Sequence, residues 1–353
     1  MKFRLNYFVI FLICSLLFVF LFCDKTKSPL EPVIKEIDKA ILNDMVENIN
    51  VGIYGEIHSV LILYNDSLVF EEYFNGCHQN SIECINDATT SISSAIIGIA
   101  IQEGYVNSVR EKLLPFFVEY SNIAFNDSLK EAITLEHVLT MTAGLSWNDE
   151  ILNQMYNSRD WIKFTLDRPM SENPGEIFNY NLGGSMLLSG IIQNTTNMLV
   201  QNFAKSKLFQ PLGIKSSYWL SDGTGKGSTG TGFCLRAFDF LRFGQLYLKK
   251  GSWTGQQLIS EEWVEISTQK WVKPHQFWWK DNEYGYHWWR YSESHRIAKI
   301  LQTNDVYFAW GWGDQFLWIL PHLEMVVVVT AGNFEKWRAA ESILWEYILP
   351  AIL

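Results

Sequence analysis

The chain has no cluster of basic residues. Its 353 residues include 28 Lys and Arg against 38 Asp and Glu, a formal net charge of −10. Because neutralising phosphates requires a basic surface, this composition argues against a nucleic-acid partner. The sequence also lacks low-complexity tracts and repeats of about 20–50 residues, which argues against solenoids and propellers. With 48% hydrophobic residues, it can form a large globular core.

Metal and cofactor motifs are also missing. His287, His295 and His322 are scattered without ligand spacing, so no metal site is predicted. The Gly-rich stretch at 222–232, DGTGKGSTGTG, lacks a preceding strand and the residue order of a phosphate-binding loop. We interpret it as a flexible loop and expect no cofactor.

The amino terminus has the pattern of an export signal. Two basic residues precede an apolar run at 7–23 that ends on Cys23. The run is slightly short for a spanning helix, which needs about 20 residues. Lipidation of Cys23, an uncleaved anchor helix and simple secretion are the alternatives, and each places the domain on the periplasmic or extracellular side. We predict a signal or anchor at 1–23 and a tether at 24–35.

Export would permit disulfide bonds. Cys77 and Cys84 bracket a polar loop, CHQNSIEC, and could close a small ring. Two unpaired thiols are the alternative. Cys234 lies alone in an apolar setting, where a cysteine is usually buried packing.

Strand patterns occur near both ends of the chain, with helical patterns between them. Runs at 57–64 and 68–74 predict a hairpin, and FLWIL and MVVVVTA predict late strands. The segment SISSAIIGIAIQ is apolar all round, which predicts a buried helix. We predict an α/β (α+β) fold for 36–353: an antiparallel sheet built from both ends of the domain, with a mostly helical insertion at about 113–263.

Seven segments occur in the order and at the spacing of a known superfamily. The chain resembles the serine β-lactamases and penicillin-binding proteins over about residues 50–345, most closely their class C and esterase-like branch. The segments are SAIIGIAIQEGYV, ITLEHVLTMTAGLSWNDE, NPGEIFNYNLGGSMLLSGIIQNTT, FAKSKLFQPLGI, LRAFDFLRFGQLYLKKGSWTGQQLISEEW, YGYHWW and AWGWGDQFLWILPHLEMVVVVTAGN. The resemblance implies hydrolysis of ester or amide bonds through a serine acyl-enzyme.

The family's first catalytic box is Ser-x-x-Lys at the start of the buried helix. Serine is a weak nucleophile, and the lysine one turn later acts as its base. In the register of SAIIG at 94–98, the serine position holds Asp87 and the lysine position holds Thr90. The only Ser-x-x-Lys in the chain, Ser267 to Lys270, lies far from this box. We therefore expect acyl-enzyme chemistry to be abolished or very weak.

Three roles are open for Asp87. Aspartate is a favoured N-cap, so a capping role is the first expectation. A carboxylate that contacts a ligand is the second. A nucleophile is the third, but its attack would give a mixed anhydride, and an ionised carboxylate has no proton to give a leaving group.

The second and third boxes are partly kept. The second contributes a tyrosine, here Tyr180, followed by Asn181. The esterase-like branch has Gly-x-Gly-Gly-Gln as its third box, where glycines let the strand approach a substrate and a backbone N–H completes an oxyanion hole. The corresponding residues are Gly311, Trp312, Gly313, Asp314 and Gln315. Asp314 is expected to put a carboxylate of the wrong sign beside the oxyanion.

Aromatic residues gather near the expected cleft: Trp147, Trp288, Trp289, Trp310 and Trp312. Aromatic walls suit sugars or peptides, although most of these rings could be core. Two functions remain open. One is an exported, membrane-tethered, catalytically impaired relative that binds a small-molecule, cell-wall, glycan-like or peptide ligand, or another protein. The other is an active esterase, amidase or β-lactamase-like hydrolase that uses residues not identified in these boxes.

Overall fold

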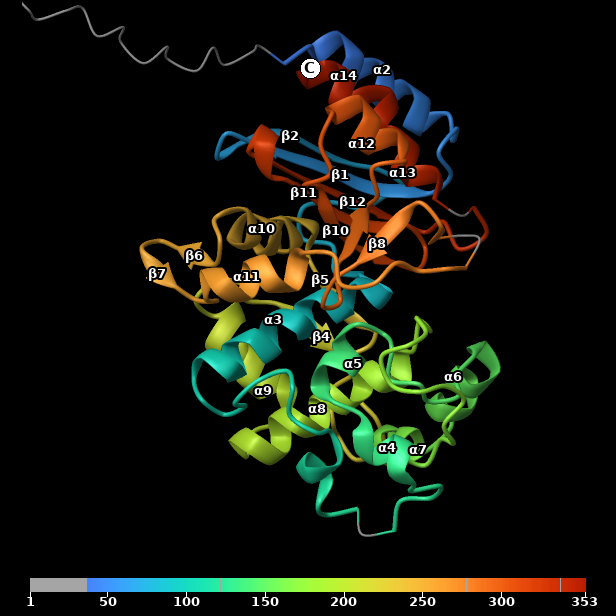
Figure 1. Cartoon of the computed structure of the whole chain (residues 1–353). Helices are drawn as coiled ribbons and strands as arrows, with labels where there is room; N and C mark the ends of the chain where they lie inside the picture. Colours follow the sequence, from blue (N-terminus) through green and yellow to red (C-terminus); the bar gives the residue numbers. More distant parts are fainter. Residues whose placement is uncertain (1–36, 121, 277–278, 337) are drawn as a thin grey trace, which may run out of the picture.

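The computed structural model describes residues 37–353 except 121, 277–278 and 337 (Figure 1). The predicted signal or anchor, the tether and the lipidation of Cys23 lie outside these described residues. Within them, none of the helices combines the length and the apolar character of a bilayer-spanning segment.

A seven-stranded antiparallel sheet forms the centre of one half of the molecule (Figure 1). Its order is β2 (Ser67–Tyr73), β1 (Ile57–Tyr64), β12 (Met325–Ala331), β11 (Gln315–Leu320), β10 (Tyr307–Gly311), β9 (Trp289–Tyr291) and β8 (Asn282–Tyr284). The hairpin β1–β2 pairs with β12 through β1, with Ile57 opposite Ala331 and Tyr64 opposite Met325. The predicted sheet built from both ends of the domain is therefore confirmed.

Both faces of this sheet are covered, which explains the unbroken apolar sequence of β12. Successive side chains of a strand point to opposite faces. Val326 and Val328 belong to the core that includes α3, α8 and α10, whereas Val327 and Val329 belong to the core beneath α2 and the C-terminal helices. Full burial of each valine contributes about 1.5–3 kcal/mol.

Helices cover the outer face of the sheet in one group (Figure 1). They are α2 (Lys39–Asn50), α12 (Arg296–Leu301), α13 (Ala339–Ile343) and α14 (Leu349–Ile352), with a π-helical turn at Leu344–Ile348. On the opposite side lie α10 (Ala237–Leu248) and α11 (Glu261–Thr268). The sheet is thus one layer between helices.

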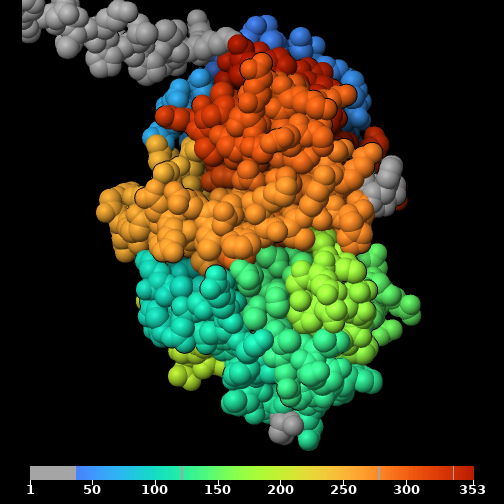
Figure 2. Space-filling view, in the orientation of Figure 1, coloured from blue at the N-terminus to red at the C-terminus, as the bar shows by residue number. Residues whose placement is uncertain are grey.

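The second half of the molecule is mostly helical (Figure 1). It contains α4 (Ser128–Ala132), α5 (Leu135–Leu139), α6 (Asp149–Tyr156), α7 (Trp161–Leu166), α8 (Leu182–Thr196) and α9 (Val200–Ala204). In the space-filling view, orange residues near 250–300 form a band between the two halves (Figure 2). The helix α3 (Thr89–Gln102) is buried from Thr89 to Ala100, as its apolar pattern predicts.

A disulfide joins Cys84 and Cys234, so the predicted Cys77–Cys84 pair is wrong. The two bonded cysteines are direct cross-strand partners of β3 (Glu83–Cys84) and β5 (Phe233–Leu235). Cys77 instead lies in the turn after β2, where its thiol donates to Glu83. The expectation that Cys234 is an unpaired packing cysteine is also wrong. Tertiary strand pairing, and not closeness in sequence, selects the partners.

Candidate functional site

Asp87 lies in a 3₁₀ turn, η1 (Asn86–Ala88), between β3 and α3. Within this turn, the backbone N–H of Ala88 donates a hydrogen bond to the Ile85 carbonyl at 3.0 Å, so it needs no side-chain cap. The N-cap of α3 is Ala88, and no side chain caps this helix. The prediction that Asp87 is an N-cap is therefore wrong, because Asp87 lies within the turn and not at the residue before the helix. The Thr231 hydroxyl and the backbone N–H of Trp312 lie close to the Asp87 carboxyl group and favour the ionised form.

The surroundings of Asp87 favour its protonated form. Burial raises the pKa of this carboxyl from 3.8 to about 7, and the negative charge of Asp149 adds to the increase. The hydrogen bonds from Thr231 and Trp312 act in the opposite direction, because they stabilise the carboxylate. At neutral pH this side chain therefore exists in both protonation states.

Thr90 lies one turn after Asp87 and cannot act as a general base. Its hydroxyl donates to the Asp87 carbonyl at 2.8 Å, so its proton is already committed to the helix backbone. Tyr180 and Tyr284 face Thr90. Burial is the main reason that the pKa of each tyrosine lies well above its ordinary value, and the charge of Asp87 contributes. Both phenols are therefore neutral at physiological pH.

Sequence reasoning missed three residues of this site, Tyr156, Thr231 and Tyr284. Tyr156 ends α6 and shares the Thr231 hydroxyl with Asp87. Thr231 belongs to the Gly-rich stretch that we predicted to be a flexible loop. That interpretation is wrong for its second half, where Ser228, Thr229 and Thr231 are buried. The run of hydroxyl residues there is the signal that could have indicated a site.

Gly311 lets the end of β10 approach the turn that carries Asp87. A Cβ at this position would overlap the Ile85 carbonyl oxygen and lie 3.1 Å from the Asp87 nitrogen. The approach brings the Trp312 N–H to Asp87, and the Trp312 carbonyl accepts from the Asn86 side chain at 2.7 Å. The glycine of the third box is therefore required for the geometry of the site.

Asp314 points away from the cleft, so the prediction of a repulsive carboxylate near an oxyanion is wrong. Its oxygens accept from the backbone N–H groups of Arg338 at 2.9 Å and Ala340 at 3.0 Å, and from the Asn333 amide at 3.2 Å. Asp314 has a left-handed backbone, with φ 65°, which aspartate tolerates better than most residues. This turn directs the side chain to the start of α13.

The other predicted wall residues are mostly structural. Trp147 is buried against Gly183, and Asn181 caps α8 by accepting from the Gly184 N–H at 2.8 Å. Trp289 is buried and stacks behind Tyr180 at 5.7 Å between ring centroids.

The third-box turn presents one aromatic ring to solvent. Gly313, with φ 82°, packs against the Phe334 ring. Trp312 lies 4.7 Å from Phe334 between ring centroids and is 56% exposed, whereas Trp288 is fully buried. Trp312 is thus the exposed aromatic residue beside Asp87.

The Ser267–Lys270 pair forms no catalytic dyad. The Ser267 hydroxyl is buried and donates to the Val264 carbonyl at 3.3 Å. The Lys270 ammonium forms an ion pair with Glu283 at 2.8 Å. Near Asp87, the Ser91 hydroxyl donates to the His287 carbonyl at 2.6 Å. These serine hydroxyls are therefore bound to backbone and have no lysine partner.

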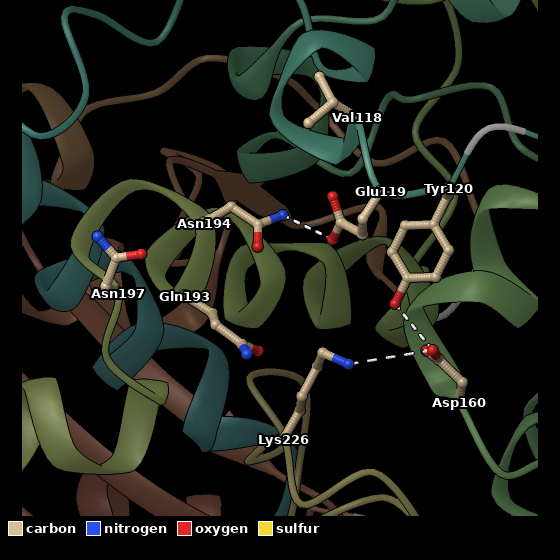
Figure 3. Close-up of a pocket in the computed structure, with 8 residues that line it drawn as sticks. All are labelled: Val118, Glu119, Tyr120, Asp160, Gln193, Asn194, Asn197 and Lys226. Carbon is tan, nitrogen blue, oxygen red and sulfur yellow. Dashed lines mark hydrogen bonds and ion pairs between the residues drawn. The ribbon is translucent and has the colours of Figure 1, made fainter.

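A separate cavity of 610 Å³ lies in the helical half, between α8 and the segment before α4 (Figure 3). Its lining is polar: Tyr120 donates to Asp160 at 2.8 Å, and Lys226 lies 3.9 Å from the same carboxylate. None of its lining residues surrounds Asp87. The charged groups of Asp160 and Lys226 thus interact with each other or with Tyr120.

The family model Beta-lactamase matches residues 58–344. The chain belongs to the beta-lactamase family. No relative was found among the curated proteins. Solved structures with the same fold include penicillin-binding proteins and hydrolases, so this chain has the beta-lactamase fold of serine hydrolases.

Three of these structures illustrate the likeness. A Bacillus anthracis protein assigned as a 6-aminohexanoate-dimer hydrolase is 20% identical, with a TM-score of 0.72 over 88% of this chain and 81% of its own. The octameric penicillin-binding protein homologue from Pyrococcus abyssi is 17% identical, with a TM-score of 0.66 over 88% and 77%. The penicillin-binding protein from Bacillus halodurans is 16% identical, with a TM-score of 0.67 over 87% and 98%.

Proposed function

We propose that this beta-lactamase-family protein binds a ligand without forming the family's acyl-enzyme. The position of Asp87 carries the proposal: its carboxyl group lies close to Thr231 and Trp312, and we propose that these residues line a recess for the ligand. In the family, a backbone N–H from this strand stabilises an oxyanion formed on the substrate. Here the carboxyl group of the protein lies beside that donor and competes for it.

The position of Thr90 supports the loss of catalysis. An acyl transfer needs a nucleophile and a base that accepts its proton. Thr90 donates its proton to a backbone carbonyl, and the neighbouring Tyr180 is neutral. Removal of a nucleophile or base lowers the rate by several orders of magnitude. We infer that the protein has lost the catalytic reaction but can still bind a ligand.

The recess suits a polar ligand with a flat face, and we propose a cell-wall or glycan-like fragment. The hydroxyls of Thr231 and Tyr156 lie beside Asp87 and can exchange hydrogen bonds with sugar hydroxyls. The exposed ring of Trp312 offers an apolar surface for stacking against a sugar.

We also propose that the domain is exported and tethered to a membrane through its amino-terminal segment. The Cys84–Cys234 disulfide supports this proposal, because such bonds persist in oxidising compartments. Palmitate labelling of the full chain and of its Cys23→Ser variant tests lipidation. Loss of label in the variant supports a lipid anchor. Absence of label in both, with the protein still in the membrane fraction, favours a helix anchor.

Ester hydrolysis tests the absence of acyl-enzyme chemistry. We expect no enzyme-like turnover of p-nitrophenyl acetate by the wild-type protein and no labelling by a fluorophosphonate probe. The double variant Asp87→Ser with Thr90→Lys should gain slow turnover and probe labelling, and Asp87→Ala is the matched control without a nucleophile. Enzyme-like turnover that persists in Asp87→Ala would overturn the proposal and establish an active hydrolase that uses other residues.

Tryptophan fluorescence tests the ligand. Titration with muropeptides should give a saturable change, because Trp312 is exposed beside the recess. A panel of peptides without sugar serves as the comparison. If neither panel changes the fluorescence or the melting temperature, the recess is not a site for these ligands.

A further inference from the structure

Three side chains of types that can bind metal ions meet near the start of β1. They are His58 of β1, Cys77 in the turn after β2 and Glu83 of β3, and one donor atom from each lies within 4.8 Å of the others. All three are partly buried. Their spacing matches no short metal motif, and the fold, not the sequence pattern, brings them together.

The distances within this cluster approach those of a metal centre. The His58 Nδ1 lies 2.9 Å from a Glu83 oxygen, and the Cys77 Sγ lies 3.4 Å from the other Glu83 oxygen. Neighbouring ligands of a tetrahedral Zn²⁺ are about 3.3–3.6 Å apart, given metal–ligand bonds of about 2.0–2.3 Å. Small side-chain movements would therefore let all three donors face one ion.

Glu56 supplies a fourth group on the far side of the imidazole. Its Oε1 lies 3.5 Å from the His58 Nε2. A metal-bound histidine commonly donates its other N–H to a carboxylate, which fixes the ring and its tautomer. The two nitrogens of His58 thus face two different carboxylates, as that arrangement requires.

We propose that His58 Nδ1, the Cys77 thiolate and the Glu83 carboxylate bind Zn²⁺, with Glu56 positioning the His58 ring. A thiolate, an imidazole and a carboxylate form a donor set suited to zinc. The thiol proton of Cys77 passes to solvent when the metal binds. Three protein ligands leave a fourth position for water.

There is open space on the Glu56 side of the His58 ring, opposite the proposed metal position. A Cβ at position 332 would lie 2.8 Å from a Glu56 oxygen and 3.2 Å from the His58 Nε2, so Gly332 keeps this side clear. A groove of 350 Å³, lined in part by Glu56, Gly332 and Phe334, opens there. Phe334 also contacts Trp312, so the groove borders the recess of Asp87. The proposal does not depend on the ligand of that recess.

Cobalt substitution tests the site in the detergent-solubilised full chain. Cys14→Ser and Cys23→Ser in the background leave Cys77 as the free thiol and keep the Cys84–Cys234 disulfide. With metal-free protein, Co²⁺ should produce a near-ultraviolet sulfur-to-cobalt charge-transfer band at one equivalent, and Zn²⁺ should abolish it. X-ray absorption of the zinc form should show one sulfur among nitrogen and oxygen ligands.

Variants separate ligation from general effects. Cys77→Ser should remove the charge-transfer band, His58→Gln should weaken Zn²⁺ binding at least tenfold, and Glu56→Gln should weaken it about tenfold or more through loss of positioning. His78→Gln is the matched control, because His78 lies next to Cys77 in sequence but outside the cluster. Binding of equal strength in the wild type and in Cys77→Ser, or a zinc spectrum without sulfur, overturns the proposal. Circular dichroism checks that each variant is folded.

Discussion

Asp87 and Asp314 are two aspartates in opposite situations. Asp314 is buried and accepts hydrogen bonds from two backbone N–H groups at the start of α13 and from Asn333. Asp87 has the Thr231 hydroxyl and one backbone N–H, and burial raises its pKa to about 7. Asp314, which was expected from the sequence to lie beside the oxyanion, therefore has a structural role. Asp87, which was expected to cap a helix, does not.

The difference shows that residue type does not determine the role of a carboxylate. Aspartate favours both helix starts and left-handed turns, so both positions are compatible with capping. The direction of the side chain decides between the roles. The 3₁₀ turn before α3 leaves Asp87 nothing to cap, whereas the left-handed turn at Asp314 directs its carboxylate to backbone N–H groups at the start of α13.

Removal of the disulfide should have the largest effect and should act mainly on the Asp87 side. Cys84 and Cys234 lie 150 residues apart, and closing a loop of this length contributes about 5 kcal/mol in the chain-entropy model. Cys84→Ser with Cys234→Ser should lower the free energy of unfolding by about 3–5 kcal/mol. Guanidinium unfolding of the wild type and the double variant measures this loss of stability.

Hydrogen exchange locates that effect. Amides around Asp87 should exchange faster in the double variant, while amides of α13, which Asp314 caps, should change less. Cys77→Ser, which removes an unpaired thiol, is the control and should cost about 1 kcal/mol or less. Equal acceleration at both aspartates would contradict a local role for the disulfide.

Asp314→Ala should destabilise the protein by about 2–4 kcal/mol. The substitution leaves the N–H groups of Arg338 and Ala340 and the Asn333 amide without their acceptor. Urea unfolding measures the loss. Asp314→Asn keeps an acceptor and tolerates the left-handed backbone, so its loss should be smaller. If both variants unfold like the wild type, Asp314 does not cap α13.

Asp87→Asn should stabilise the protein more at pH 8 than at pH 5. Between pH 4 and 7 the folded wild type keeps a proton that the unfolded chain has released, since its pKa rises from 3.8 to about 7. Wild-type stability therefore falls as pH increases through this window and is level above it. The full shift corresponds to about 4 kcal/mol, and solvent contact at the partly exposed side chain should reduce the effect to about 2 kcal/mol.

Urea unfolding of Asp87→Asn and of the wild type at pH 5 and 8 measures this difference. The difference between the proteins isolates Asp87 from other titrating groups. A variant that is less stable than the wild type at pH 8 would show that the charge of Asp87 stabilises the fold, as a cap would.

Trp312→Ala should have the smallest effect on stability, about 1 kcal/mol or less, because the ring is 56% exposed. If the ligand of the recess stacks on this ring, affinity should fall about tenfold, equivalent to about 1.4 kcal/mol. Isothermal calorimetry with the muropeptide that binds best measures it. Trp271→Ala, a ring that is 41% exposed and stacks on Tyr286, is the matched control and should keep full affinity.

Local patterns predicted the elements well. The apolar run of β1 follows from burial on both faces of the sheet, and the apolar stretch of α3 follows from burial on all sides of the helix; a short window of sequence records both. The sheet built from both ends of the domain followed from the strand patterns there. The strand and helix patterns themselves depend only on neighbouring residues in the sequence.

The site was less predictable, because it depends on register between distant segments. The pairing of Cys84 with Cys234 and the meeting of Asp87 with Thr231 both arise where the segment before α3 meets β5 and the loop that precedes it. No short window contains both partners. The capping error at Asp87 has a local origin, since it overlooked the 3₁₀ turn at Asn86–Ala88 that precedes α3 and includes Asp87.

The pairing of β1 with β12 also constrains the order of assembly. Ser59 and Thr330, whose hydroxyls lie 2.7 Å apart, are separated by 271 positions. The early hairpin keeps one open edge until nearly the last strand of the polypeptide has been made, and open edges template aggregation. A chain truncated before Met325 should therefore yield inclusion bodies instead of a shorter soluble product, and nascent copies need a holding chaperone until synthesis is complete.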